Sequence, residues 1–252
     1  MQKTRIFSVI TSFLLASSHV AIATSIGVNF AFDGTGTSYD LGPTDVTGVI
    51  AQDNWNNIHA QATPGLIDSQ GGGTGATLFV SGGYVGVSSA VSPGTPTANL
   101  LHSAADDNGH SIVLSNIPYP TYDVYVYVAG QGSTAGLYTA NSVTLQAYNS
   151  SDGSTAFVDA SSPFGTYIDF VGLSGPTLTI TAVGQSPSTI TGQYQSPVDG
   201  FQVVLTPEPT SLTLFACGAI CLAGIAFRRS LRTRRLLPIR SRSCTKMLSN
   251  AI

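Results

Sequence analysis

The central part of this chain lacks lysine, arginine and cysteine. Apart from histidines, the only ionised residues of segment 24–209 are twelve aspartates and Glu208, and cysteine is absent from residues 24–206. Only 9% of the 252 residues are charged, against a usual fraction of about 25%. The chain is long enough to bury one substantial core, and without cysteine that core has to be stable without disulfides.

These absences exclude several classes of chemistry. Without lysine or cysteine, residues 24–206 cannot form a Schiff base or use a thiol nucleophile, and they cannot bind zinc through thiolates. Without arginine or lysine they have no side-chain cation for phosphate, and their negative charge repels nucleic acid. Because the only glutamate is Glu208, metalloprotease motifs of the HExxH type and glutamate-based glycosidase pairs are also absent.

The basic residues are confined to the two ends. Residues 1–23, 24–209 and 210–252 carry formal charges of +2, −13 and +8, which together give the net charge of −3. Residues 1–23 contain Lys3 and Arg5, an apolar run, and the small residues Ala21 and Ala23. This order is typical of a secretory signal peptide, and it predicts cleavage after Ala23.

The C-terminal end combines a short motif, an apolar run and a basic cluster. Pro207, Glu208 and Pro209 precede an apolar stretch, and we predict a transmembrane helix over residues 211–227. The arginines that follow are typical of a stop-transfer segment held on the cytoplasmic side: Arg228, Arg229, Arg232, Arg234 and Arg235. Residues 236–252 form a basic tail that we expect to be disordered.

Residues 207–235 resemble the PEP-CTERM sorting signal of bacterial exported proteins. The resemblance rests on the Pro-Glu-Pro tripeptide, one apolar helix with small residues, and the arginine cluster. It implies a membrane-embedded cysteine protease, an exosortase, as partner, with Pro207, Glu208 and Pro209 as the recognised residues. The resemblance also implies transient anchoring in the cytoplasmic membrane, followed by transfer to the cell surface or extracellular matrix. Members of this family usually end near the arginines, whereas this chain continues to Ile252.

The body between these ends, residues 24–206, has the pattern of an all-β fold. Apolar and polar side chains alternate with period two in residues 25–32, 123–128, 143–148, 177–182 and 201–205. Shorter candidate strands are residues 46–50, 76–80, 84–88, 111–115 and 167–171, and residues 98–105 are the one candidate helical turn. We therefore predict an antiparallel, jelly-roll-like β-sandwich between the N-terminal signal helix and the C-terminal membrane helix.

The body also resembles uncharacterised exported β-sandwich proteins of planctomycete and verrucomicrobial type. The residues that carry the resemblance are 46–57 (VTGVIAQDNWNN), 122–127 (YDVYVY) and 199–204 (DGFQVV). This resemblance implies a fold and an extracellular habitat but no activity.

Aspartates and one tryptophan are the candidate binding residues of the body. Asp33 with Asp40, and Asp106 with Asp107, supply the oxygen ligands that calcium prefers, although neither pair has the spacing of a defined calcium loop. Aspartates are also favoured in turns, which explains them without a metal. Trp55 lies among asparagines that suit sugar hydroxyls, and it is equally suited to fill the core. No other cofactor is expected.

Two further patterns leave alternatives open. His59, His102 or His110 would serve a serine hydrolase only if one of them met a serine and an aspartate in a cleft. Tyr125 and Tyr127 lie on one strand face with Asp123, where they form either an exposed aromatic ladder or cross-strand pairs.

These observations favour an exported, non-enzymatic protein of the cell surface or extracellular matrix. The first alternative is a carbohydrate-binding module for extracellular polysaccharide, and the second is a hydrolase that uses aspartate or a serine–histidine pair.

Overall fold

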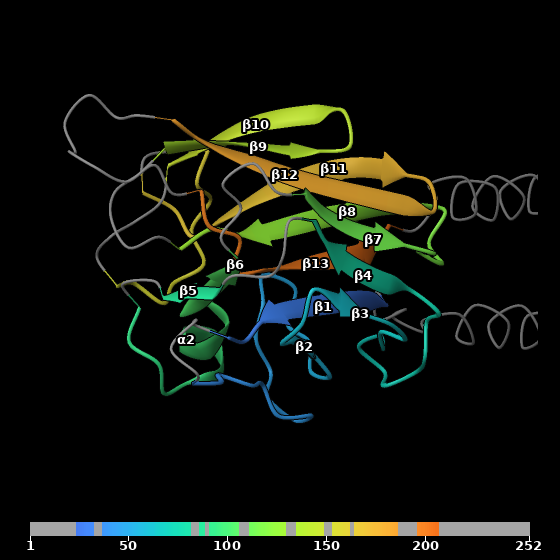
Figure 1. The fold of residues 1–252 in the computed structure, drawn as a ribbon, viewed down its shortest axis with the longest axis horizontal. Helices are drawn as coiled ribbons and strands as arrows, with labels where there is room; N and C mark the ends of the chain where they lie inside the picture. The colour runs from blue at the N-terminus through green and yellow to red at the C-terminus, as the bar shows by residue number, and fades with distance from the viewer. Residues whose placement is uncertain are drawn as a thin grey trace, which may run out of the picture. The chain divides into compact units, whose positions relative to one another are not determined.

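The computed structural model of the protein has strands arranged in two facing sheets (Figure 1). It describes residues 24–32, 37–81, 86–88, 91–105, 111–129, 135–148, 153–161, 164–185 and 196–206. The described strands are β1 (Ser25–Phe30), β2 (Asn56–Ile58), β3 (Ala62–Thr63), β4 (Thr77–Val80), β5 (Gly86–Ser88), β6 (Ser103–Ala105), β7 (Ser111–Ser115), β8 (Thr121–Tyr127), β9 (Ala135–Ala140), β10 (Val143–Tyr148), β11 (Tyr167–Ser174), β12 (Thr177–Gln185) and β13 (Gly200–Leu205). Helix α2 spans Pro96–Leu100.

The strand order confirms the expected β-sandwich. One sheet has the order β11-β8-β13-β1-β2, the other has the order β10-β9-β12-β7-β4-β3, and β5 pairs separately with β6. All of these pairs are antiparallel except β1 with β2, which run parallel. A parallel pair needs a long connection, and residues 31–55 between the two strands supply one.

The main core lies between the two sheets. Inward-facing residues of the five-stranded sheet, such as Val28 and Val124, are fully buried with Leu178 and Leu114 of the six-stranded sheet. The period-two alternation of β8, β12 and β7 therefore follows from one face packing on the other sheet.

A second core covers part of the outer face of the five-stranded sheet. It consists of the buried residues Leu41, Trp55, Val91, Ala98, Leu100, Leu101, Tyr127 and Ala129. Helix α2 contributes two of them, and it begins where the Thr95 side chain accepts a hydrogen bond from the Ala98 N–H (3.2 Å), with Pro96 in the first turn. The core residues that the structure describes all belong to the body, and the division of the chain into compact units falls after Pro207.

One local prediction is wrong, and another is confirmed only in part. Residues 46–50 form a turn instead of a strand, because Thr47 pairs with Gln52 and Gly48 has a φ of 102°, which a strand does not allow. Residues 98–105 are only partly helical: α2 ends at Leu100, and β6 begins at Ser103.

The predicted membrane helix over residues 211–227 and the signal peptide over residues 1–23 lie outside the described residues. Among the residues that the structure does describe, no helix has the length and apolar character required to span a membrane.

Candidate functional site

Trp55 lies inside the second core. Its side chain is only 4% exposed, its indole N–H donates to the Gln52 carbonyl (3.1 Å), and its ring centroid lies 6.1 Å from that of Tyr127. The ring fits because Gly27 beneath it has no side chain: a Cβ there would lie 2.8 Å from the indole. The prediction that Trp55 provides a platform for sugar rings is therefore wrong, because the indole ring is buried and offers no open face to a ligand.

A buried polar network fixes the segment that covers Trp55. Gln202 donates from Nε2 to the Ile50 carbonyl (2.7 Å) and to Gln52 Oε1 (2.9 Å), and its own Oε1 accepts from the Tyr127 hydroxyl. Ser25 Oγ also donates to Gln52 Oε1 (2.6 Å). Because these groups bind one another in the interior, the network holds residues 47–52 on the sheet and is not a ligand site.

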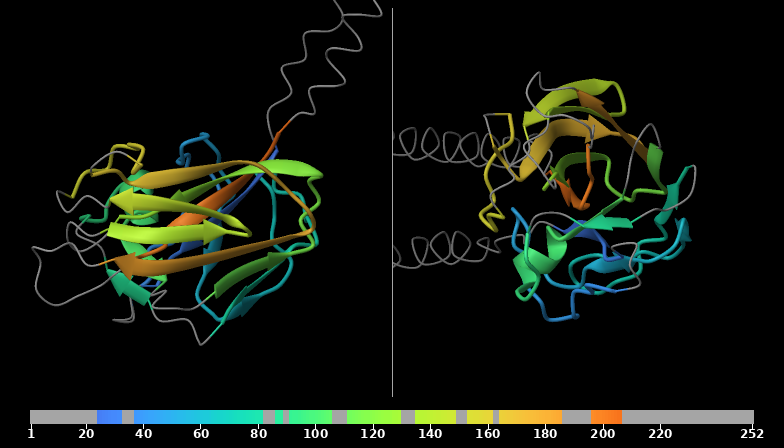
Figure 2. Two further views of the ribbon diagram at one scale, coloured as in Figure 1. Left: turned by 90° about the horizontal axis from the view of Figure 1, so that it is seen from above. Right: turned by 60° about the vertical axis from the view of Figure 1, so that its left-hand side comes forward.

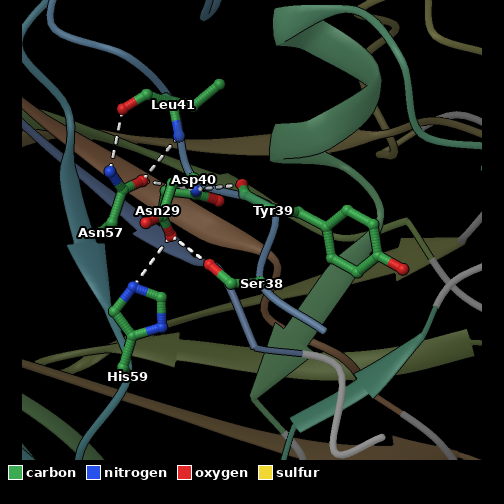
Figure 3. A network of polar contacts seen from close by, with 7 residues as sticks. All are labelled: Asn29, Ser38, Tyr39, Asp40, Leu41, Asn57 and His59. Carbon is green, nitrogen blue, oxygen red and sulfur yellow. Dashed lines mark hydrogen bonds and ion pairs between the residues drawn. The ribbon is translucent and has the colours of Figure 1, made fainter. Parts of the chain in front are cut away.

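An exposed polar cluster of Ser38, Asp40 and His59 lies where the parallel strands β1 and β2 end (Figure 3). Ser38 Oγ donates to Asp40 Oδ1 (2.6 Å), and His59 Nε2 lies 2.8 Å from the same oxygen. The side chains of His59 and Asp40 are 43% and 52% exposed, respectively, so water screens this ion pair.

Two asparagines hold the backbone that carries Asp40. Asn57 accepts from the Leu41 N–H and donates to the Leu41 carbonyl, both at 2.9 Å. Asn29 donates from Nδ2 to the Tyr39 carbonyl (3.1 Å) and to Asn57 Oδ1 (2.8 Å), as Figure 3 shows. The cluster is therefore fixed by Asn29 of β1 and Asn57 of β2, and no sequence motif marks these two asparagines as site residues.

The order of contacts in this cluster does not suit nucleophilic catalysis. In a serine hydrolase the histidine lies between serine and aspartate and accepts the hydroxyl proton. Here Asp40 lies between the other two residues and accepts from both, so His59 does not activate Ser38. In the described part of the chain, no three histidine, cysteine, aspartate or glutamate side chains are grouped to hold a metal.

His102 has a structural role. It is buried, and its Nδ1 lies 2.6 Å from the Val91 carbonyl oxygen. Because a carbonyl can only accept, Nδ1 carries the proton. The imidazole also meets the Tyr39 ring edge-on at 4.2 Å between centroids, which ties residues 39–41 to the segment after α2.

A strip of two tyrosines and two aspartates lies on the outer face of β8 and β11, and we call it the tyrosine strip. It consists of Tyr125, Tyr167, Asp123 and Asp169. The two rings lie 6.1 Å apart between centroids, and Asp169 pairs with Tyr125 across the strands. Burial raises the pKa of Tyr125, and the negative charges of Asp123 and Asp169 raise it further.

The sequence predicted only part of this strip. Tyr125 and Asp123 lie on one face as expected, but Tyr127 is buried in the second core, where its ring lies 5.4 Å from that of Phe157 between centroids. Tyr127 pairs with Tyr167 across the strands, which is the second of the two arrangements expected for it, and the Tyr167 ring also lies beside that of Tyr125. The alternation along β11 indicates that Tyr167 and Asp169 share one strand face, but it does not show that β11 pairs with β8.

Asp199 is the most deeply buried carboxyl group among the described residues. Its Oδ2 accepts from the Ala129 N–H, and its Oδ1 has no hydrogen-bond partner. Burial raises the pKa of Asp199 well above its ordinary value, because removal from water disfavours the charged form. A group enclosed in this way does not face a dissolved ligand.

The other predicted site residues lie outside the described residues. They are the cleavage residues Ala21 and Ala23, the aspartates Asp33, Asp106 and Asp107, the histidine His110, the tripeptide Pro207, Glu208 and Pro209, and the arginines Arg228, Arg229, Arg232, Arg234 and Arg235. Of the predicted calcium ligands, the structure describes Asp40, which binds Ser38 and His59.

Comparisons with known proteins give no family. No family model matches the chain, and no curated protein matches it. Among solved structures, protein YXIM of Bacillus subtilis is similar with a TM-score of 0.39 and 10% identity, over 72% of this chain and 40% of that one. An exo-β-1,3-galactanase of Phanerochaete chrysosporium, solved with galactose, has a TM-score of 0.28 and 13% identity, over 59% of this chain and 30% of that one. Both scores are too low to carry an argument about function.

Proposed function

We propose that this chain is an exported, non-enzymatic protein of the cell surface or extracellular matrix with a jelly-roll-like body. Residues 1–23 direct export, and the helix over residues 211–227 holds the chain in the cytoplasmic membrane. An exosortase-like protease recognises Pro207, Glu208 and Pro209 and removes the C-terminal tail. The observation that carries the proposal is the segregation of all lysines and arginines to the two ends of an acidic body.

The way the body ends supports processing at both ends. Ser25 in β1 pairs with Val204 in β13, and the Leu205 N–H donates to the Thr24 carbonyl (3.0 Å). The residue that follows the expected signal cleavage thus lies beside the residues that precede the Pro-Glu-Pro tripeptide. The core residues that the structure describes all lie between these two predicted processing points.

The side-chain arrangement supports a non-enzymatic role. His59 and Ser38 meet at one oxygen of Asp40 instead of bonding to each other, and His102 is bonded to a backbone carbonyl. The body also lacks every lysine, arginine, cysteine and glutamate that other reaction classes would use.

Replacing Glu208 with alanine is expected to abolish C-terminal processing. The full chain is produced in one host that has an exosortase and in one that lacks it, and the mature protein is weighed by intact mass spectrometry. The unmodified chain should lose its C-terminal segment only in the first host, and the Glu208→Ala chain should keep it in both. Asp159→Ala, which removes an exposed acid of the body, should be processed normally. An identical C-terminus of the unmodified chain in both hosts would refute the sorting role.

A second candidate function is binding of a neutral polysaccharide at the tyrosine strip. Half-buried tyrosine rings provide flat apolar surfaces for sugar rings, and the Asp123 and Asp169 carboxylates accept hydrogen bonds from sugar hydroxyls. This candidate replaces Trp55, which is buried, by an aromatic pair that reaches the surface.

Replacing Tyr125 with alanine is expected to reduce the retardation of the body in gels that contain a soluble β-glucan or xylan. Loss of one stacked ring costs about 0.5–1.5 kcal/mol, or roughly a two- to tenfold loss of affinity. Tyr148→Ala is the matched control, because Tyr148 is an exposed tyrosine (37%) on the other sheet. If the unmodified body migrates freely in every gel, or if both variants behave alike, the tyrosine strip is not a sugar site.

A further inference from the structure

The outer face of the six-stranded sheet is uncharged, and we call it the neutral face. On β12 the outward residues Thr177, Thr179 and Thr181 alternate with the buried Leu178 and Ile180. The corresponding outward positions of β4, β7 and β9 are also uncharged, and they hold threonine, serine, valine, leucine and phenylalanine. No outward residue that the structure describes in these four strands carries a charge.

Two apolar spots lie on the neutral face. In the first, Phe79 of β4 pairs with Val113 of β7, and in the second, Val183 of β12 pairs with Leu137 of β9. Phe79 is 47% exposed and Val183 is 53% exposed, so the described elements leave both spots open to solvent. The other sheet differs, because α2 and residues 41–55 lie over part of its outer face (Figure 2).

We propose that two copies of the body associate through their neutral faces. Each body carries twelve aspartates and no lysine or arginine, so two copies repel one another wherever their aspartates approach. A second copy can approach the neutral face without burying a carboxylate of β4, β7, β9 or β12, which would be costly. Two such faces would stack sheet on sheet, at about 10 Å separation.

The register of the strands suits a two-fold interface. Thr181 of β12 pairs with Ser111 of β7, and this pair lies midway between the two apolar spots. A two-fold axis that lies in the interface, passes over this pair and runs perpendicular to the line joining the two spots brings the first spot of one copy near the second spot of its partner. Apolar surface then meets apolar surface twice in a closed, self-complementary contact.

The size of the face predicts a weak dimer. Six strands at about 4.8 Å spacing, with rows about 20 Å long, give roughly 500 Å² per copy. This area is below the roughly 800 Å² per partner of a stable interface, so we expect a dissociation constant in the micromolar range. Association should strengthen as salt is raised from about 0.05 M to about 0.5 M, because salt screens the repulsion between the acidic bodies.

Sedimentation velocity of residues 24–206 from about 5 to about 500 µM tests the proposal over the expected affinity range. Val183→Asp should weaken association about tenfold or more, because a carboxylate would then be buried in the contact. Val171→Asp is the matched control: Val171 is an exposed valine (70%) on β11 of the other sheet, and this change should leave association within about twofold of the unmodified body.

A cysteine cross-link gives an independent measurement if the aspartate variant folds poorly. The body has no cysteine of its own, so Thr181→Cys introduces a single thiol close to the expected axis. Mild oxidation should produce a covalent dimer of Thr181→Cys but not of Val171→Cys. The proposal is overturned if the unmodified body is monomeric throughout, or if the two aspartate variants associate equally. Retention of a monomeric body on insoluble β-glucan, lost in Val183→Asp, would assign the face to polysaccharide instead of a second copy.

Discussion

Replacing Trp55 with alanine is expected to lower the free energy of unfolding of the body by about 3–5 kcal/mol. The indole is buried between Gly27 and Tyr127, and its N–H is bonded to the Gln52 carbonyl. Alanine would leave a cavity in the second core that the covering segment cannot fill, because the Gln52–Gln202 network holds that segment in position.

Urea denaturation followed by circular dichroism measures this loss. Tyr148→Ala is the control, because that exposed ring lies outside both cores and its removal should cost less than about 1 kcal/mol. Since Trp55 is the only tryptophan, the native fluorescence of the unmodified protein should also report a buried indole. A loss below about 1 kcal/mol for Trp55→Ala would contradict its role in the core.

Replacing Gly200 with alanine is expected to cost about 2–4 kcal/mol. A Cβ at this position would lie 2.3 Å from the Val28 backbone oxygen and 3.0 Å from Leu100 Cδ1. Because the first of these is a backbone atom of the adjacent strand, the clash is relieved only if β13 moves away from β1. The change would therefore weaken the pairing of the first and last strands of the body as well as the packing of α2.

Gly73→Ala is the matched control for this substitution. No atom lies within 4 Å of a Cβ at Gly73, and its φ is outside the left-handed region. Its effect should lie between no change and a gain of about 1 kcal/mol, because alanine restricts the unfolded chain. Equal unfolding midpoints in urea for the two alanine variants would show that the close approach of the strands at Gly200 does not affect the stability of the body.

Alternation along the sequence predicted the strands whose two faces differ most. In β8 and β12 every second residue is apolar and buried, so the pattern identified both strands. β9 was missed because it begins with Ala135 and Gly136, which have low strand propensity, although its inward residue Tyr138 is fully buried. Residues 46–50 have the composition of a strand, but Gly48 and the contacts of Gln202 with Ile50 make them a turn.

The polar clusters depend on pairings that the sequence does not reveal. Asp40 and His59 meet only because β2 runs parallel to β1, and Tyr125 meets Tyr167 only because β11 pairs with β8. Trp55 had two interpretations at the sequence level, and its burial depends on Gly27. The terminal segments are different, because their composition alone predicts export and sorting, whatever the fold of the body.

The position of β13 determines when the body can fold. This strand lies between β8 and β1 in the five-stranded sheet, yet it is the last strand of the body in the chain. Until Leu205 is available, β1 and β8 have no partner between them, and Phe201 and Val203 are missing from the main core. In a chain that emerges from its N-terminus, the five-stranded sheet therefore cannot be completed until nearly all of the body is available.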